Sequence, residues 1–141
     1  MKNPHSQEGV MLIEALIGIL IFSIGILALI GMQATAIKNT TDARYRSEAA
    51  FLANQIIGQM WVDRPNLTRY DHDDAGNYGP RNDWRTTVQT ALPGIDIVNN
   101  ILVPEIQVGA SNEVTVTIRW KQPSEDSTRS FQMINRINGP V

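Results

Sequence analysis

A long apolar run near the amino terminus constrains the fold of this chain more than any other feature. Residues 15–37 contain no charged side chain, and Lys38 is the first charge after them. At about 1.5 Å per helical residue this stretch is roughly 34 Å long, enough to cross the hydrocarbon core of a bilayer. A cleaved secretory signal has a shorter apolar core, of about 7–15 residues. The run therefore predicts a membrane-spanning helix.

The helix is expected to continue beyond the apolar run as an amphipathic segment. Apolar residues recur there at the spacing of one helix face: Ala49, Leu52, Ala53, Ile56, Ile57 and Met60. Pro65 is the first residue that breaks this pattern. We expect one helix from about Val10 to Val62, apolar on all sides in its first half and with one apolar stripe in its second half.

The last third of the chain has the two-residue period of β-strands. Residues 113–121 alternate apolar and polar side chains, a pattern typical of a half-buried strand. Residues 128–137 predict a second strand with Phe131, Met133 and Ile137 facing inward. Residues 96–108 predict a third strand, interrupted by Pro104. The expected fold class is α+β, with a long helical spine packed against a small antiparallel sheet.

The segment between the helix and the strands predicts a loop followed by a short helix. Residues 65–83 are polar and rich in Asn, Asp and Gly, which favours a long loop. Asn82 is expected to cap a helix over residues 83–92, ended by Pro93 and Gly94. Trp84 on that helix is interpreted as a core anchor against the apolar stripe.

The acidic cluster at residues 71–74 raises the alternative of a metal site. An EF-hand requires oxygen ligands at alternate positions and a glutamate at the twelfth. Counted from Asp71, Asp73 fits, but the fifth position is Ala75 and the twelfth is Asn82. We therefore expect a solvated loop and no metal site.

Composition argues against catalysis and nucleic-acid binding. The chain has no cysteine and two histidines, so it offers no convincing nucleophile set. Its formal net charge is −2, with basic residues scattered among acidic ones, which gives no cationic field for nucleic acid. We expect no enzymatic activity, no catalytic or cofactor-binding residues and no nucleic-acid partner.

Glu14 is a carboxylate inside the apolar run, five residues after Gly9. One interpretation places it at the level of the lipid headgroups, where a charge is easily accommodated. The other assumes a cut after Gly9, which would create an amino terminus at Val10, one helical turn from Glu14. A helix amino terminus is partially positive and a free amine adds a full charge, so Glu14 could neutralise the amine of a neighbouring subunit. The residues alone leave both interpretations open.

The sequence around Glu14 resembles the class III signal of type IV prepilins. Such a signal has a short polar leader that ends in glycine, then a few apolar residues and a glutamate, as in Gly9, Val10 and Glu14 here. More narrowly, residues 9–33 are similar to the minor-pilin family called type IV pilus modification protein PilV, with its G-V-x-L-I-E-x-L start and S-I-G-x-L-x-L-x-G-x-Q continuation. The later segments NDWRTTVQTALPG and VTVTIRW also look like that family.

The resemblance implies roles for individual residues. A prepilin peptidase would cut between Gly9 and Val10, Val10 would be N-methylated, and Glu14 would direct assembly. The implied parts are a leader (1–9), a transmembrane and assembly half of the helix (10–37), its amphipathic half (38–64) and a globular head (65–141). Many pilins have Phe at the position of Val10, and the leader is usually more basic than this one.

The resemblance also implies location and partners. The chain would span the bacterial inner membrane once, with its head in the periplasm, and would later enter the pilus fibre. Its partners would be major and minor pilins through the amino-terminal helix, the prepilin peptidase and inner-membrane lipid. Basic residues usually lie on the cytoplasmic side of a span, but Lys38, Arg44 and Arg46 after this span outnumber Lys2 before it. The expected orientation therefore follows from the motif and not from the charges. Two alternatives are a pseudopilin of a type II secretion system and a non-polymerising, signal-anchored periplasmic binding module.

Overall fold

The chain folds as an α+β protein. The computed structural model describes residues 7–123 and 125–138. Its elements in chain order are α1 (Gln7–Val62), the 3-10 helix η2 (Arg64–Tyr70), α2 (Gly79–Ala91), β1 (Glu105–Val108), the 3-10 helix η3 (Ala110–Asn112), β2 (Glu113–Trp120) and β3 (Arg129–Arg136). The predicted fold class is confirmed, since a long apolar amino-terminal helix is followed by a small antiparallel sheet, a pilin-like architecture.

Helix α1 belongs to two compact units of the chain. These units are Met1–Asp42 and Ala43–Val141, so the boundary between them lies within the helix. In the first unit every residue from Gly9 to Thr40 is exposed, and the helix is long and apolar enough to cross a membrane. These properties fit a single membrane anchor or a signal segment. Residues 1–6 of the expected leader lie outside the described residues.

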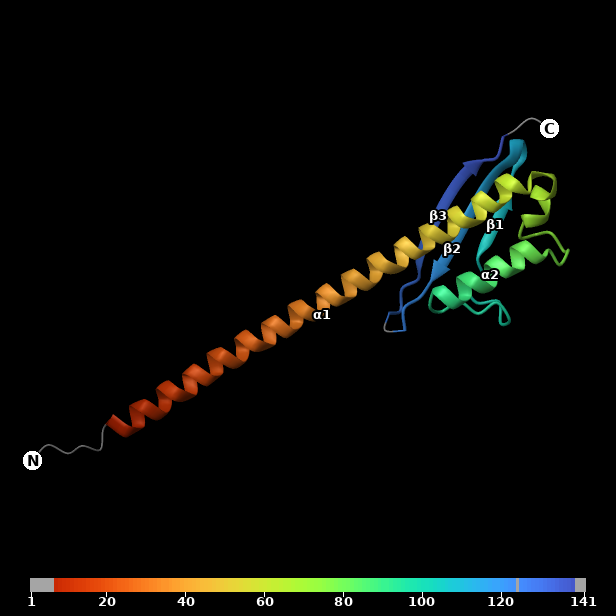
Figure 1. Ribbon diagram of the computed structural model, residues 1–141. Coiled ribbons are helices and arrows are strands. Elements are labelled where there is room, and N and C mark those ends of the chain that lie inside the picture. Colours follow the sequence, from red (N-terminus) through yellow and green to blue (C-terminus); the bar gives the residue numbers. More distant parts are fainter. Residues whose placement is uncertain (1–6, 124, 139–141) are drawn as a thin grey trace, which may run out of the picture. The chain divides into compact units, whose positions relative to one another are not determined.

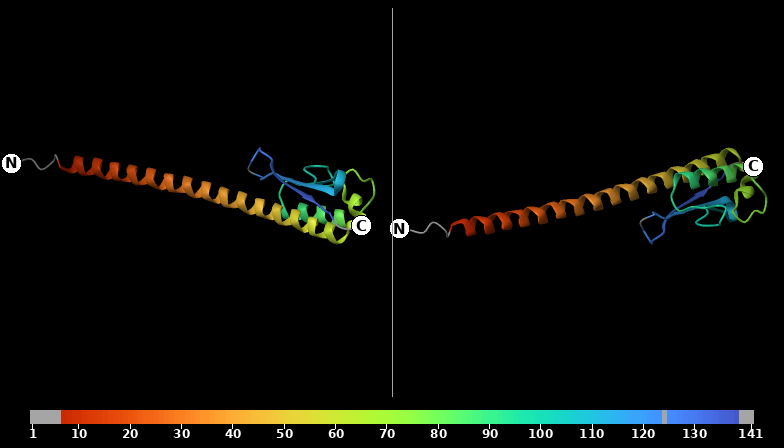
Figure 2. Two further views of the ribbon diagram at one scale, coloured as in Figure 1. Left: turned by 90° about the horizontal axis from the view of Figure 1, so that it is seen from above. Right: turned by 90° about the horizontal axis from the view of Figure 1, so that it is seen from below.

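The second unit contains a three-stranded antiparallel sheet with strand order β1-β2-β3. Val116 in the central strand pairs with Ile106 on one side and with Met133 on the other. Helix α2 and the Ala43–Val62 part of α1 cover the same face of this sheet (Figure 1; Figure 2). On that face the side chains of β2 are buried and those of β3 are partly buried, while those on the opposite face are more exposed, as the two-residue period requires.

The core of the second unit forms between this face of the sheet and the two helices. All six residues of the predicted stripe on α1 are buried, and so are Val114, Val116, Ile118 and Trp120 on β2. Phe131 and Met133 are partly buried and pack against the same core, as expected from the strand pattern. Each fully buried Val, Leu, Ile or Met side chain contributes roughly 1.5–3 kcal/mol. The stripe on α1 therefore stabilises the head directly.

The structure corrects two expectations about the segment after α1. The expected loop over residues 65–83 is confirmed only for residues 71–78, because η2 forms at Arg64–Tyr70 with Pro65 in its first turn. Proline fits a first turn, where the missing N–H has no helical acceptor and φ is already helical. Helix α2 likewise begins at Gly79, with Pro80 in its first turn, and its N-cap is Tyr78 rather than Asn82. Asn82 lies inside the helix.

Gly94 is required where the chain passes close to the end of β2. Its φ is +80°, and a Cβ there would lie 2.8 Å from the carbonyl oxygen of Lys121. The N–H of Lys121 donates a hydrogen bond of 3.0 Å to the carbonyl of Pro93, which fixes this approach. Only glycine fits both the positive φ and the short distance.

Candidate functional site

The first candidate site is the exposed surface around Glu14 on α1. Val10, Ile13, Glu14 and Ile17 line a shallow hollow on one side of the helix. Their spacing of three and four residues places them on the same face, so Glu14 is flanked by three aliphatic side chains. These side chains are half-exposed or more in the isolated chain, at 65% for Val10, 59% for Ile13 and 50% for Ile17. An apolar surface that surrounds one carboxylate suits a partner that is apolar and carries one positive group.

Gly9 and Val10 lie in the first turns of the same helix. Helix α1 begins at Gln7, so the peptide bond between Gly9 and Val10 has helical conformation. Apart from the adjacent helix backbone, no atom of the described residues lies within 4 Å of the place where a Gly9 side chain would start. The structure thus places the three predicted site residues close together on one exposed helix end, and their roles in cleavage, methylation and assembly remain predictions.

The rest of the apolar half carries no other charge. The hydroxyls of Ser23 and Thr35 donate to the carbonyls of Ile19 and Gly31 in their own helix, at 2.7 and 3.1 Å. A second shallow groove, at the end of the apolar half, is lined by Ala28, Gly31, Met32, Thr35, Ala36 and Asn39. The hydroxyls of Ser23 and Thr35 are therefore satisfied within the helix, and Glu14 alone supplies a charge between residues 9 and 37.

A second candidate site is a cluster of polar side chains where α1, η2 and α2 meet. The carboxylate of Asp63, just after α1, accepts hydrogen bonds from the hydroxyls of Tyr70 (3.0 Å) and Tyr78 and from the amide of Asn66 (2.7 Å). The bonds from Tyr78, Asn66 and Tyr70 hold the pKa of the Asp63 carboxyl below its usual value. Burial raises the pKa of both phenols, and the Asp63 charge raises it further. The two rings meet edge to face with centroids 4.9 Å apart.

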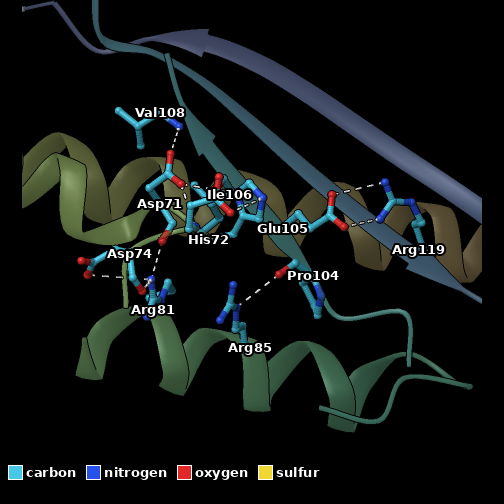
Figure 3. A network of polar contacts seen from close by, with 11 residues as sticks. Asp71, His72, Asp74, Arg81, Arg85, Pro104, Glu105, Ile106, Val108 and Arg119 are labelled. Atoms are coloured by element: carbon cyan, nitrogen blue, oxygen red, sulfur yellow. Dashed lines mark hydrogen bonds and ion pairs between the residues drawn. The ribbon is translucent and has the colours of Figure 1, made fainter. Parts of the chain in front are cut away.

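Arg81 organises the turn that leads from η2 to α2. Its side chain is buried and donates hydrogen bonds to the backbone carbonyls of Asp71, Asp74 (3.1 Å) and Gly76 (2.6 Å). Figure 3 shows the guanidinium pointing from α2 toward this turn. A guanidinium has five N–H donors in one plane, so one side chain can bind several carbonyls of a turn, which are not bonded within a helix or a sheet. Arg81 is therefore a structural residue.

The predicted loop cluster at residues 71–74 holds the turn against β1. Ligand atoms of Asp71, His72 and Asp73 lie within 4.8 Å of one another. The Asp71 carboxylate, however, accepts the N–H of Asp73 (2.9 Å) and of Val108 (2.6 Å), and the ring of His72 lies 3.1 Å from the carbonyl of Ile106. These contacts account for the clustering, and we assign no metal to these residues.

An ion pair lies on the outer face of the sheet. Arg119 on β2 binds Glu105 on β1 through two hydrogen bonds, of 2.8 and 3.3 Å (Figure 3). The bonds from Arg119 lower the pKa of the Glu105 carboxyl, and the same pairing raises the pKa of Arg119. Both side chains are about one third exposed, so solvent screens the pair and it adds little to stability.

Sequence reasoning missed the roles of Asp63, Tyr70, Tyr78 and Arg81. Tyr70 and Tyr78 lie 7 and 15 residues after Asp63 in the chain. They reach its carboxylate only because η2 and the turn after it fold back toward the end of α1. The one available signal was Arg81 next to a proline and a run rich in Asn, Asp and Gly, which suits a side chain that binds turn carbonyls.

Comparison with protein-family models, curated proteins and solved structures gives no match for this chain. The arguments about function therefore depend on the architecture and on the residues themselves.

Proposed function

We propose that this chain is a minor type IV pilin that is made as a prepilin and takes part in pilus assembly. A prepilin peptidase cuts the bond between Gly9 and Val10, Val10 is N-methylated, and the apolar half of α1 packs among other pilins. The observation that supports this proposal best is Glu14, a single carboxylate on an exposed aliphatic helix face, one turn from Val10.

Glu14 gives the assembly its register. A carboxylate that faces lipid is costly, and a cation on a neighbouring helix removes much of that cost. After cleavage, the amine of Val10 adds a full positive charge to the partially positive helix end. The Glu14 of one subunit pairs with this amine in its neighbour, and the aliphatic side chains around both exclude water. Incorporation into the fibre is then favoured over remaining alone in the inner membrane.

The cleavage step needs a local opening of the helix. Peptidases act on extended backbone, and the Gly9–Val10 bond is helical in the isolated chain. It lies within the first turn, where amides have no helical acceptors and opening has little free-energy cost. In this proposal the chain is the substrate of an enzyme and has no catalytic role, cofactor or nucleic-acid partner of its own.

The first test is intact mass and amino-terminal mapping of the protein recovered from bacterial membranes. We expect a form that starts at Val10 and is one methyl group heavier than the unmodified peptide. An uncut chain, or a cut near the end of the apolar run, would contradict prepilin processing and favour an anchored or secreted module.

The second test is Glu14→Ala, with Ser23→Ala as the matched control on the same exposed helix. We expect Glu14→Ala to be processed normally but to be absent from purified fibres, and Ser23→Ala to behave as wild type. Equal incorporation of both variants would contradict the role of Glu14.

Deletion of the chain distinguishes a pilin from a pseudopilin. Loss of pili would support a pilin, and loss of protein secretion would support a pseudopilin.

A further inference from the structure

The two edges of the sheet are covered differently. At the outer edge of β1, the N–H of His72 donates to the carbonyl of Ile106 at 2.7 Å, and the N–H of Val108 donates to the carboxylate of Asp71 at 2.6 Å. Arg85 also reaches the carbonyl of Pro104 just before the strand, at 3.2 Å. The turn after η2 and helix α2 therefore occupy this edge (Figure 3).

The hydrogen-bonding direction of each strand follows from these contacts. In an antiparallel strand the N–H and C=O of one residue point to the same side, and successive residues alternate. Ile106 and Val108 point outward, so their neighbours Glu105 and Gln107 point toward β2. The same alternation, carried through the strand register, turns Phe131 and the other odd-numbered residues of β3 toward β2. The residues of β3 that point to the free edge are Ser130, Gln132, Ile134 and Arg136.

The outward backbone groups of β3 have no partner in the described part of the chain. No hydrogen bond from residues 7–123 or 125–138 reaches the N–H or C=O of these four residues. Such a row of donors and acceptors binds an extended peptide as an added strand. The neighbouring side chains have room for one, because Phe131 and Met133 are only partly buried and Ile134 is 62% exposed.

We propose that the free edge of β3 binds an extended segment of a different polypeptide, which adds a fourth strand to the sheet. Residues of that segment that face the helices are apolar and cover Phe131 and Met133. A carboxylate lies at the end next to Arg136, whose side chain is 55% exposed and uses one of its nitrogens to reach Glu113. This inference depends on the second unit alone and goes beyond the proposed function.

A second copy of this chain fits the edge poorly. Strand β3 has an arginine at each end and no carboxylate, so a second β3 offers Arg136 no partner, since its Arg129 is already paired with Glu125 at 3.1 Å. The outer edge of β1 in another copy is already covered.

The test is site-specific photo-cross-linking of the full chain in its native cells. A photoreactive residue replaces Ser130, Gln132 or Ile134, one at a time, and the cross-linked peptides are mapped by mass spectrometry. We expect the three positions to link to successive alternate residues of one segment in another protein, because opposed residues of paired strands have Cβ atoms only about 5 Å apart. The control is Gln107, an exposed residue on β1, where we expect no such series.

Two variants separate edge pairing from simple proximity. Gln132→Pro removes an outward N–H that the β2–β3 ladder does not use, and we expect loss of the cross-link from Ser130 with retained thermal unfolding. If this variant does not fold, Arg136→Glu replaces it, and we expect loss of the cross-link from Ile134 with recovery in Arg136→Lys. The proposal is overturned by links to β3 of a second copy, by links to unrelated sites, by an equal series from Gln107, or by the absence of any adduct.

Discussion

The indole Nε1–H of Trp84 donates a hydrogen bond of 2.9 Å to the backbone carbonyl of Leu52. Both residues are nearly fully buried, at 4% and 2% exposure, and they join α2 to the stripe on α1. The predicted role of Trp84 as a core anchor is thereby confirmed. Trp120 on β2 is buried to the same degree, but its Nε1 has no hydrogen-bond partner in the described part of the chain.

This difference between the two tryptophans predicts unequal costs of replacement by phenylalanine. Both substitutions lose similar packing, but only Trp84→Phe also loses a hydrogen bond. We expect Trp84→Phe to lower the free energy of unfolding by about 1 kcal/mol more than Trp120→Phe. Urea unfolding of the full chain in detergent micelles, followed by circular dichroism, measures both values. Equal costs would mean that the bond to Leu52 contributes nothing.

The Asp63 cluster predicts acid sensitivity of the head. The pKa of Asp63 is lowered in the folded chain, so as pH falls the unfolded chain binds this proton first. The stabilisation is full above the unfolded value, near 3.8, and is lost as pH falls through the folded value. We expect Asp63→Asn to reduce the loss of stability below about pH 4 relative to wild type.

The control for this pH dependence is Asp83→Asn, at an exposed position on α2. Its thermal-unfolding profile between neutral and acidic pH is expected to match that of wild type. Glu105 and Asp96 also have lowered pKa values, so part of the acid sensitivity persists in Asp63→Asn. An unchanged profile in Asp63→Asn would show that the cluster is not the source.

Arg81 predicts a large effect from one substitution in α2. In Arg81→Met, the carbonyls of Asp71, Asp74 and Gly76 lose their charged donor while the turn still packs against β1. We expect the free energy of unfolding to fall by about 1.5–3 kcal/mol, since the turn loses its hydrogen bonds to a charged group. Arg64→Met is the control, because Arg64 is exposed and lies over the ring of Trp61. Similar melting temperatures for the two variants would contradict this role.

Two glycines predict opposite responses to alanine. Gly94→Ala places a Cβ 2.8 Å from the Lys121 carbonyl at a φ of +80°, and we expect a loss of at least about 1–2 kcal/mol. Gly58 lies on an exposed part of α1 with no atom within 4 Å of a Cβ position, so Gly58→Ala should raise stability by up to about 1 kcal/mol. Differential scanning calorimetry compares them, and a shift of the same sign in both would refute the argument.

The periodic parts of the fold could be predicted from the sequence. The stripe from Ala49 to Met60 recurs at helical spacing, and the alternation from Val114 to Trp120 has the period of a strand, so burial follows from each pattern. Each pattern depends only on residues that are close together in the chain, and these residues serve mainly to pack the core. They were sufficient for the fold class and for the face of each element that is buried.

The segment between α1 and β1 could not be predicted in the same way. Pro65 was interpreted as the residue that breaks the helical pattern, yet it lies in the first turn of η2, and Pro80 lies in the first turn of α2. Asn82 has the chemistry of a helix cap, but its amide donates to the side chain of Asn77 instead. Contacts between distant residues decide these choices, as when Tyr78 binds Asp63, and one-dimensional patterns do not contain them.

The candidate site around Glu14 follows from the sequence as far as position is concerned. Helical spacing alone places Val10, Ile13 and Ile17 beside the carboxylate, and the structure has them on one face. After a cut, the partner of the Val10 amine would lie on a neighbouring helix. The helical spacing within one chain does not describe contacts with another chain.

The boundary between the two units lies inside α1, where the described chain has a continuous helix and no loop. A traction force applied to the apolar half is therefore transmitted along hydrogen-bonded backbone into the stripe from Ala49 to Met60. There it is resisted in shear by the side chains packed against the sheet. The head is thus expected to yield abruptly under load, when the helix slides out of its own core.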